Sequence, residues 1–152
     1  MGPLAAPSGS VVYLDANSII YSVERIAPYH ALLQPIWQGA ATGMRSLMTS
    51  GLSLLETLVG PLKSGDTLLE AGYRNLLTGA SDVRLAPVTE AVLERAAEIR
   101  ATTNLKTPDA IHAATALVEG CAVFITNDPA FRRMSALSSG MAITVLDDLI
   151  TP

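Results

Sequence analysis

Short runs of β-branched and apolar residues alternate with longer helical patterns along most of this 152-residue chain. Such alternation is typical of βαβ units, in which helices cover both faces of a parallel sheet. The strand candidates are the segments 11–14, 45–49, 83–86, 123–125 and 143–146. The sequence therefore predicts an α/β fold with three layers, α/β/α, around a mostly parallel central sheet of four to five strands.

The segments between these runs carry apolar residues at helical spacing, or have helix-forming composition. We expect helices over residues 17–23, 29–41, 52–63, 67–77, 90–101 and 108–118, and a short helix after Pro129. Thr107 and Pro108 suit the N-cap and N1 positions of the helix that ends at Val118. No repeat or interdomain linker interrupts the pattern, so we expect one domain over 11–152.

The composition describes an apolar-rich globular chain. Hydrophobic residues make up 49% and charged residues 16%, against roughly 25% charged in an average soluble domain. No apolar run approaches the roughly 20 residues that a membrane-spanning helix needs. Residues 1–10 are rich in Gly, Pro and Ser and have no signal-peptide pattern, so we expect a flexible lead-in. With Cys121 as the one cysteine, we expect a cytoplasmic protein without an internal disulfide.

The net charge of −4 comes from 14 acidic residues against 10 lysines and arginines. A protein that coats nucleic acid electrostatically would instead be basic. The charge balance does not argue against an enzyme that meets nucleic acid through a bound metal ion.

Two acidic residues stand where a ligand site is expected, and two others are candidates for other reasons. Asp15 and Asp128 follow predicted strands, and ligands of open parallel sheets bind beyond the carboxyl ends of the strands. Asp109 lies in the first turn of a predicted helix. Glu56 lies among leucines, where an unpaired buried charge would be costly. Together these positions favour a functional role over four unrelated structural ones.

Each of these acids also has a purely structural interpretation. Asp15 would cap the following helix, and Asp109 would be favoured by the helix dipole. Glu56 would be a solvated helix residue, and Asp128 would belong to a turn. Thr126, two residues before Asp128, either orients a water or an acid or is an ordinary strand-end threonine.

The sequence resembles PIN-domain ribonucleases, and among them the VapC-type toxins of type II toxin–antitoxin systems. The resemblance covers roughly residues 11–134 and places the four acids in the order of that family. The LDAN and PDAIHAATA elements are specific in combination. The matching stretches are VVYLDANSIIY, MTSGLSLLETLVGPLK, LKTPDAIHAATAL and VFITNDPAFRRM.

The resemblance implies a PIN-like domain that hydrolyses RNA phosphodiester bonds with Mg²⁺ or Mn²⁺. Asp15, Asp109 and Asp128 are the expected metal ligands, while Glu56 either ligates, acts through water or orients the nucleophile. Thr126 would support the catalytic group. Hard cations prefer oxygen ligands, and a cation would offset the mutual repulsion of the carboxylates. The resemblance also implies a homodimer and a cognate antitoxin protein as partners.

Two other functions fit the same resemblance: a PIN nuclease of RNA processing that is not a toxin, and an inactive binding module with a PIN fold. The complete acidic set argues against the inactive module. A phosphatase with an aspartyl nucleophile would need an aspartate two residues after Asp15, where the chain has Asn17. The chain also lacks the GxxxxGK[ST] motif of nucleotide hydrolases.

His112 lies three residues after Asp109 and shares its helical face. A packing or supporting role for this imidazole is favoured over that of a general base. Arg132 and Arg133 follow Asp128 and either contact RNA phosphates or are scattered solvated charges.

Overall fold

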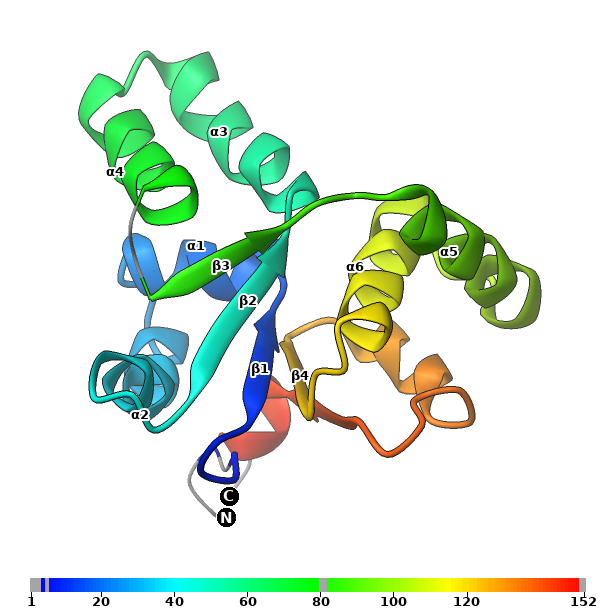
Figure 1. Ribbon diagram of the computed structural model, residues 1–152. Helices are drawn as coiled ribbons and strands as arrows, with labels where there is room; N and C mark the ends of the chain where they lie inside the picture. Colours follow the sequence, from blue (N-terminus) through cyan, green and yellow to red (C-terminus); the bar gives the residue numbers. More distant parts are fainter. Residues whose placement is uncertain (1–3, 5, 80–81, 151–152) are drawn as a thin grey trace.

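The computed structural model describes residues 4, 6–79 and 82–150, and it confirms the predicted α/β/α domain (Figure 1). Its sheet has the strand order β3-β2-β1-β4-β5, and all neighbouring strands are parallel. The strands are β1 (Val11–Leu14), β2 (Ser46–Ser50), β3 (Val83–Ala86), β4 (Val123–Thr126) and β5 (Ala142–Val145).

The helices also follow the predicted pattern, with ends that differ by one or two residues. They are α1 (Ala16–Val23), α2 (Tyr29–Ala41), α3 (Leu52–Ser64), α4 (Thr67–Thr78), α5 (Glu90–Thr103) and α6 (Thr107–Val118), with 3-10 helices η1 (Pro129–Met134) and η2 (Leu146–Leu149).

Several predicted boundaries are wrong by one or two residues, among them the start of α6 and the end of β2. Thr107 is the first residue of α6 and not its N-cap; Lys106 takes the cap position without a side-chain hydrogen bond. Strand β2 runs one residue further than predicted, to Ser50, which pairs with Ala86 of β3. Serine is rarely a strand signal, but Ser50 is fully buried here, so tertiary pairing overrides its local preference.

Strand β1 lies at the centre of the sheet, and its side chains alternate between the two faces. Val12 and Leu14 point into one core and Tyr13 into the other. From β1 the chain continues outward through β2 and β3 on one side and through β4 and β5 on the other. The reversal of strand order therefore falls between β1 and β4, the place where ligands bind in such sheets.

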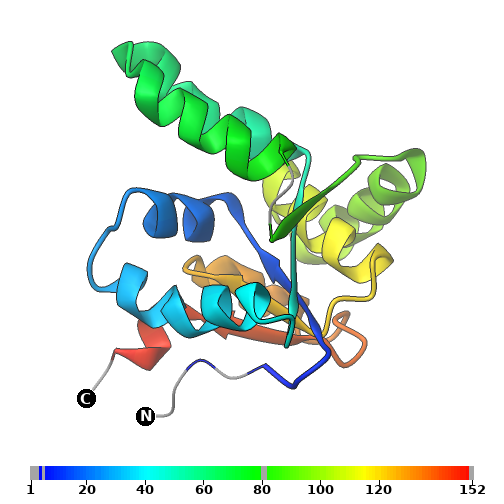
Figure 2. The ribbon, with the colours of Figure 1, turned by 60° about the vertical axis from the view of Figure 1, so that its left-hand side comes forward.

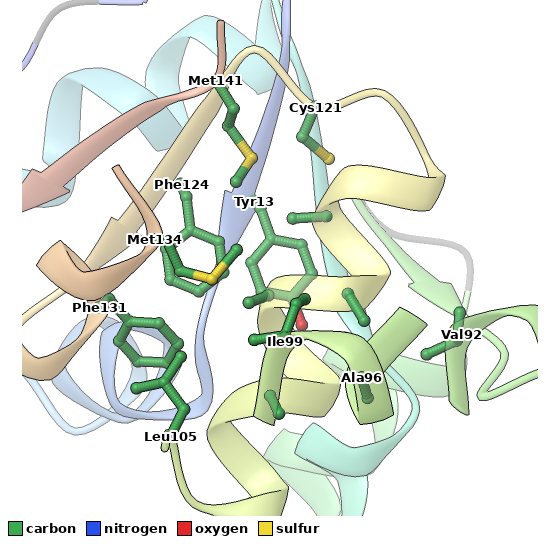
Figure 3. Packing of buried hydrophobic residues seen from close by; sticks show 14 of the residues in the cluster. Tyr13, Val92, Ala96, Ile99, Leu105, Cys121, Phe124, Phe131, Met134 and Met141 are labelled. Atoms are coloured by element: carbon green, nitrogen blue, oxygen red, sulfur yellow. The ribbon is translucent and has the colours of Figure 1, made fainter. Parts of the chain in front are cut away.

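Helices α5 and α6 and the 3-10 helix η1 cover the face that carries Tyr13. Its ring stacks on Phe124 at a centroid distance of 4.9 Å, and Phe124 in turn contacts Phe131 at 4.7 Å. Figure 3 shows Tyr13 in the middle of this cluster, beside Phe124 and Ile99. Cys121 is buried at the edge of the same cluster, as a packing role predicts.

The core of the other face combines residues from α1, α2 and α4 with the opposite side of the strands. Leu4 and Ala6 are buried in it, and the Arg45 guanidinium donates a hydrogen bond to the Ala6 carbonyl. The predicted lead-in over 1–10 therefore packs against the domain at these two residues. Residues 1–3 and 5 lie outside the described part of the chain, and the flexibility of the lead-in stays a prediction.

Helices α3 and α4 form a hairpin that projects from the rest of the domain (Figure 2). The turn between them has Gly65 in the left-handed region at φ 73°, followed by Asp66, whose carboxylate caps α4. The hairpin leaves Leu55, Leu62 and Leu68 exposed. Among the described residues, no helix is both long and apolar enough to cross a membrane.

We predict that Ile99→Ala lowers the free energy of unfolding by about 2–5 kcal/mol, because Ile99 is fully buried between α5 and the sheet. Leu93→Ala on the same helix is the matched control, since Leu93 is 50% exposed, and its effect should stay within about 0.5 kcal/mol. Urea unfolding measures both. Equal losses in the two variants would contradict the described packing of α5.

Candidate active site

The pairing of β1 with β4 places Asp15 beside Thr126 at the carboxyl edge of the sheet. Leu14 pairs with Ile125, and the Asp15 backbone N–H donates to the Ile125 carbonyl. The Thr126 hydroxyl donates to Asp15 Oδ2 at 2.6 Å and accepts from the Asp128 backbone N–H at 3.0 Å. Thr126 is fully buried, so it holds Asp15 and the Asp128 turn from behind.

Asp15 caps α1 while its carboxylate stays buried. Its Oδ1 accepts from the Ser18 backbone N–H at 2.9 Å, and the residue is 5% exposed. Burial raises the pKa of this carboxyl group, while the hydrogen bonds from Thr126 and Ser18 work in the opposite direction. The capping interpretation is therefore confirmed as one role of Asp15. Both oxygens are also fixed in position.

Asp109 and Asp128 belong to the same concentration of negative charge. Burial raises the pKa of Asp109, and the charges of Asp128, Glu56 and Asp15 raise it further, against a lowering by His112. Asp128 caps η1, with Oδ1 accepting from the Ala130 backbone N–H at 2.8 Å. A carboxyl group perturbed both by burial and by neighbouring carboxylates is typical of a functional site.

Glu56 reaches this site from α3, in the projecting hairpin (Figure 2). Its Oε1 lies 2.5 Å from His112 Nε2, and its side chain is 31% exposed. The charge among leucines therefore has a partner. Sequence reasoning missed this pair, because the two residues lie 56 positions apart and no local pattern joins them. The shared helical face of Asp109 and His112 was the one available signal.

Three of the predicted acids line one pocket of about 170 Å³ at the carboxyl edge of the sheet; its lining residues include Asp15, Asn17, Glu56, Asp109, His112 and Phe131. Asp128 is not among the lining residues, although its charge acts on Asp109. A larger cavity of about 640 Å³ lies at the opposite end of the strands, where Arg84 is paired with Glu119 at 2.9 Å. We place the site in the smaller pocket because the perturbed carboxyl groups and the reversal of strand order are found there.

The donor set fits a hard divalent cation in kind. Carboxylate oxygens are the ligands that Mg²⁺ and Mn²⁺ prefer, and the repulsion felt by Asp109 is what a cation would relieve. As the side chains stand, no group of three or more His, Cys, Asp or Glu among the described residues is arranged to hold a metal ion. Glu56 is turned to His112, and both oxygens of Asp15 accept hydrogen bonds.

The basic residues after Asp128 have partners within the domain. Arg132 donates to both oxygens of Asp148, at 2.6 and 2.7 Å, and both side chains are exposed. Arg133 donates to the Asn104 carbonyl. Exposed pairs of this kind exchange readily with solvent and contribute little to stability.

A model of the PIN domain family matches residues 12–137. The chain belongs to the PIN domain family. The match confirms the resemblance seen in the four acidic motifs, and membership in this family supports a nuclease. No curated protein sequence gives a significant match.

Solved structures of VapC-type proteins have the same fold. VapBC2 of Rickettsia felis, bound to a DNA fragment from its promoter, is 16% identical, covers 89% of this chain and 98% of its own, and has a TM-score of 0.66. VapC20 of Mycobacterium tuberculosis, a sarcin-ricin loop cleaving toxin, is 18% identical. The match covers 84% of this chain and 97% of VapC20, with a TM-score of 0.67. FitAcB of Neisseria gonorrhoeae is 22% identical. The match covers 87% of this chain and 95% of the FitAcB chain, with a TM-score of 0.61.

We predict that Asp15→Asn does not destabilise the metal-free PIN domain at neutral pH. Because burial raises the folded-state pKa of Asp15, the wild type loses stability as the pH rises from the ordinary aspartate pKa through that raised value, and the neutral amide avoids this cost. The gain of the variant over the wild type should shrink as the pH falls toward the ordinary aspartate pKa, where Asp15 is protonated.

Thermal melts in EDTA over a pH series measure this difference. Asp66→Asn is the matched control, because Asp66 also caps a helix but is exposed, and asparagine caps about as well as aspartate. Its melting temperature should show no such trend. A strong loss of stability in Asp15→Asn at neutral pH would mean that the ionised carboxylate is needed for folding.

Proposed function

We propose that this PIN domain is a divalent-metal-dependent endoribonuclease that acts as the toxin of a toxin–antitoxin pair. The observation that carries the proposal is the convergence of Asp15, Glu56 and Asp109 on one pocket, with Asp128 close enough to raise the pKa of Asp109. Helix capping accounts for Asp15 and Asp128 individually, but it does not account for four carboxylates at one edge of the sheet. A bound cation would offset the repulsion among these carboxylates.

In this proposal Asp15, Asp109, Asp128 and Glu56 hold Mg²⁺ or Mn²⁺. Held there, such a cation would supply a water of lowered pKa and positive charge opposite the scissile phosphate. The protein's own contribution is to keep the ligands in place. Thr126 acts in this way, since its hydroxyl donates to Asp15 and accepts from the backbone of Asp128.

Comparison with other proteins supports RNA as the substrate and an antitoxin as the partner. VapC20 of Mycobacterium tuberculosis cleaves the sarcin-ricin loop, and other structures with this fold are toxin–antitoxin complexes, such as the one from Klebsiella pneumoniae. An antitoxin segment with a basic residue would suit the negative pocket, because a guanidinium pairs bidentately with a carboxylate. A cytoplasmic location belongs to the same proposal.

We predict that the protein cleaves single-stranded RNA with Mg²⁺ or Mn²⁺ and loses this activity in EDTA. Asp109→Asn should lower the cleavage rate by on the order of 100-fold or more, the usual effect of removing one electrostatic stabiliser. Gel-based cleavage of a labelled RNA measures both effects. Glu98→Gln, which removes an exposed charge on α5, is the control and should cleave at the rate of the wild type. Undiminished cleavage by metal-free protein in excess EDTA would contradict the proposal.

We also propose a homodimer that uses the exposed apolar side chains of the α3–α4 hairpin, among them Leu62 and Leu68. Light scattering at micromolar concentration should give the dimer mass, and Leu62→Glu should shift it toward the monomer. Leu93→Glu is the control, because Leu93 is exposed on α5 away from the hairpin, and this variant should stay dimeric. A monomeric wild type would contradict this assembly.

A further inference from the structure

A buried series of hydrogen bonds connects strand β2 to Glu56 through the aromatic core. The Ser50 backbone N–H donates to the Tyr13 hydroxyl at 3.0 Å. That hydroxyl lies 2.6 Å from His112 Nδ1, and His112 Nε2 lies 2.5 Å from Glu56 Oε1. Tyr13 and His112 are 0% and 3% exposed. The proposed function does not by itself use Tyr13 or His112.

The backbone N–H of Ser50 can only donate, so the Tyr13 oxygen is the acceptor in that bond. The neutral phenol then has its own proton to donate, and His112 Nδ1 lies 2.6 Å away to accept it. That nitrogen is then the acceptor, and the ring proton of the neutral imidazole lies on Nε2, facing Glu56.

This tautomer suits a holding role and not proton abstraction. The nitrogen that faces the pocket carries a proton, and the lone pair on Nδ1 is occupied by the phenol inside the core. A general base needs a free lone pair within reach of the water it deprotonates. His112 can therefore donate to Glu56 but cannot accept a proton from the pocket while Tyr13 is bound to it.

Glu56 needs a hydrogen-bond donor because it lies on a projecting helix and its side chain is partly exposed to solvent. Its helix α3 belongs to the projecting hairpin (Figure 2), and its side chain is 31% exposed. A partly exposed glutamate without a partner would lose side-chain entropy on being held in one position. His112 lies on α6, one turn after Asp109. Its contact with Glu56 therefore links the position of the Glu56 carboxylate on α3 to that of Asp109 on α6.

We propose that His112, held as the Nε2–H tautomer by the Tyr13 hydroxyl, is a positioning residue that fixes Glu56 at the acidic pocket. The role of Glu56 toward a cation rests on the proposed function, whereas the tautomer of His112 does not. The two parts therefore need separate measurements.

The tautomer is measured on the metal-free, ¹⁵N-labelled protein by long-range ¹H–¹⁵N correlation of the imidazole rings. The chain has two histidines, and His112→Gln assigns the signals. We expect the Nδ1 of His112 to resonate as an unprotonated ring nitrogen and Nε2 as a protonated one. In Tyr13→Phe this preference should be lost. An Nδ1–H tautomer in the wild type, or an unchanged ring spectrum in Tyr13→Phe, would overturn the inference.

The positioning role is measured by titrating the full chain with Mn²⁺ in calorimetry. The asparagine amide can take the place of Nδ1 opposite Tyr13, but it is too short to reach Glu56. The longer glutamine side chain can place its amide nitrogen where Nε2 contacts Glu56. His112→Asn should therefore weaken Mn²⁺ binding by about 10- to 100-fold, the usual cost of losing a group that orients a ligand, and His112→Gln should bind closer to the wild type.

A double-mutant cycle with Glu56→Gln separates positioning from general damage to the site. If His112 acts through Glu56, adding His112→Asn to Glu56→Gln should cause no further loss of Mn²⁺ affinity. Additive losses would overturn the positioning role. A wild type that binds no Mn²⁺ would contradict the proposed function and with it the role toward a cation, and the imidazole spectrum would still decide whether Tyr13 sets the tautomer.

Discussion

The parallel pairing of β1 with β4 is the constraint on which the rest of this structure depends. It joins segments more than 100 residues apart and lets the Thr126 hydroxyl donate to a carboxylate, that of Asp15, which is 5% exposed. A charge buried to this degree is tolerated only with hydrogen bonds to both oxygens, and Ser18 supplies the other one. The acid that begins α1 is therefore held in place before any ligand binds. The remaining carboxylates gather around it.

The aromatic core also serves the site. Tyr13 packs on Phe124 like any core residue, yet its hydroxyl reaches His112 and, through it, Glu56. A phenylalanine would fill the same space but leave the Ser50 N–H and the imidazole without this partner. Such buried polar groups are costly when half satisfied and rigid when fully satisfied. One side chain thus takes part both in the packing of the sheet and in the hydrogen bonds that lead to Glu56.

The fold was predictable because its signals are local. Helix and strand periods, the turn at Gly65 and Asp66, and the acids after β1 and β4 all lie within a few residues of what they determine. The pair between Glu56 and His112 was not predictable in this way. It depends on how α3 and α6 approach each other, and no spacing in the sequence records that distance. The end of β2 was mispredicted for the same reason, because the strand reaches Ser50 only through pairing with Ala86 of β3.

The charge of the pocket imposes an order on anything that binds there. Burial raises the pKa of Asp109, and the charges of Asp128, Glu56 and Asp15 raise it further. A phosphate group that approached this edge alone would meet the same repulsion, which a domain of net charge −4 does little to offset. A cation reverses the local sign, so in the proposed nuclease its binding must precede or accompany that of the RNA. A basic side chain from another protein would reverse it equally well. The negative charge that would attract a metal ion in the proposed nuclease would therefore also attract a competing cationic peptide.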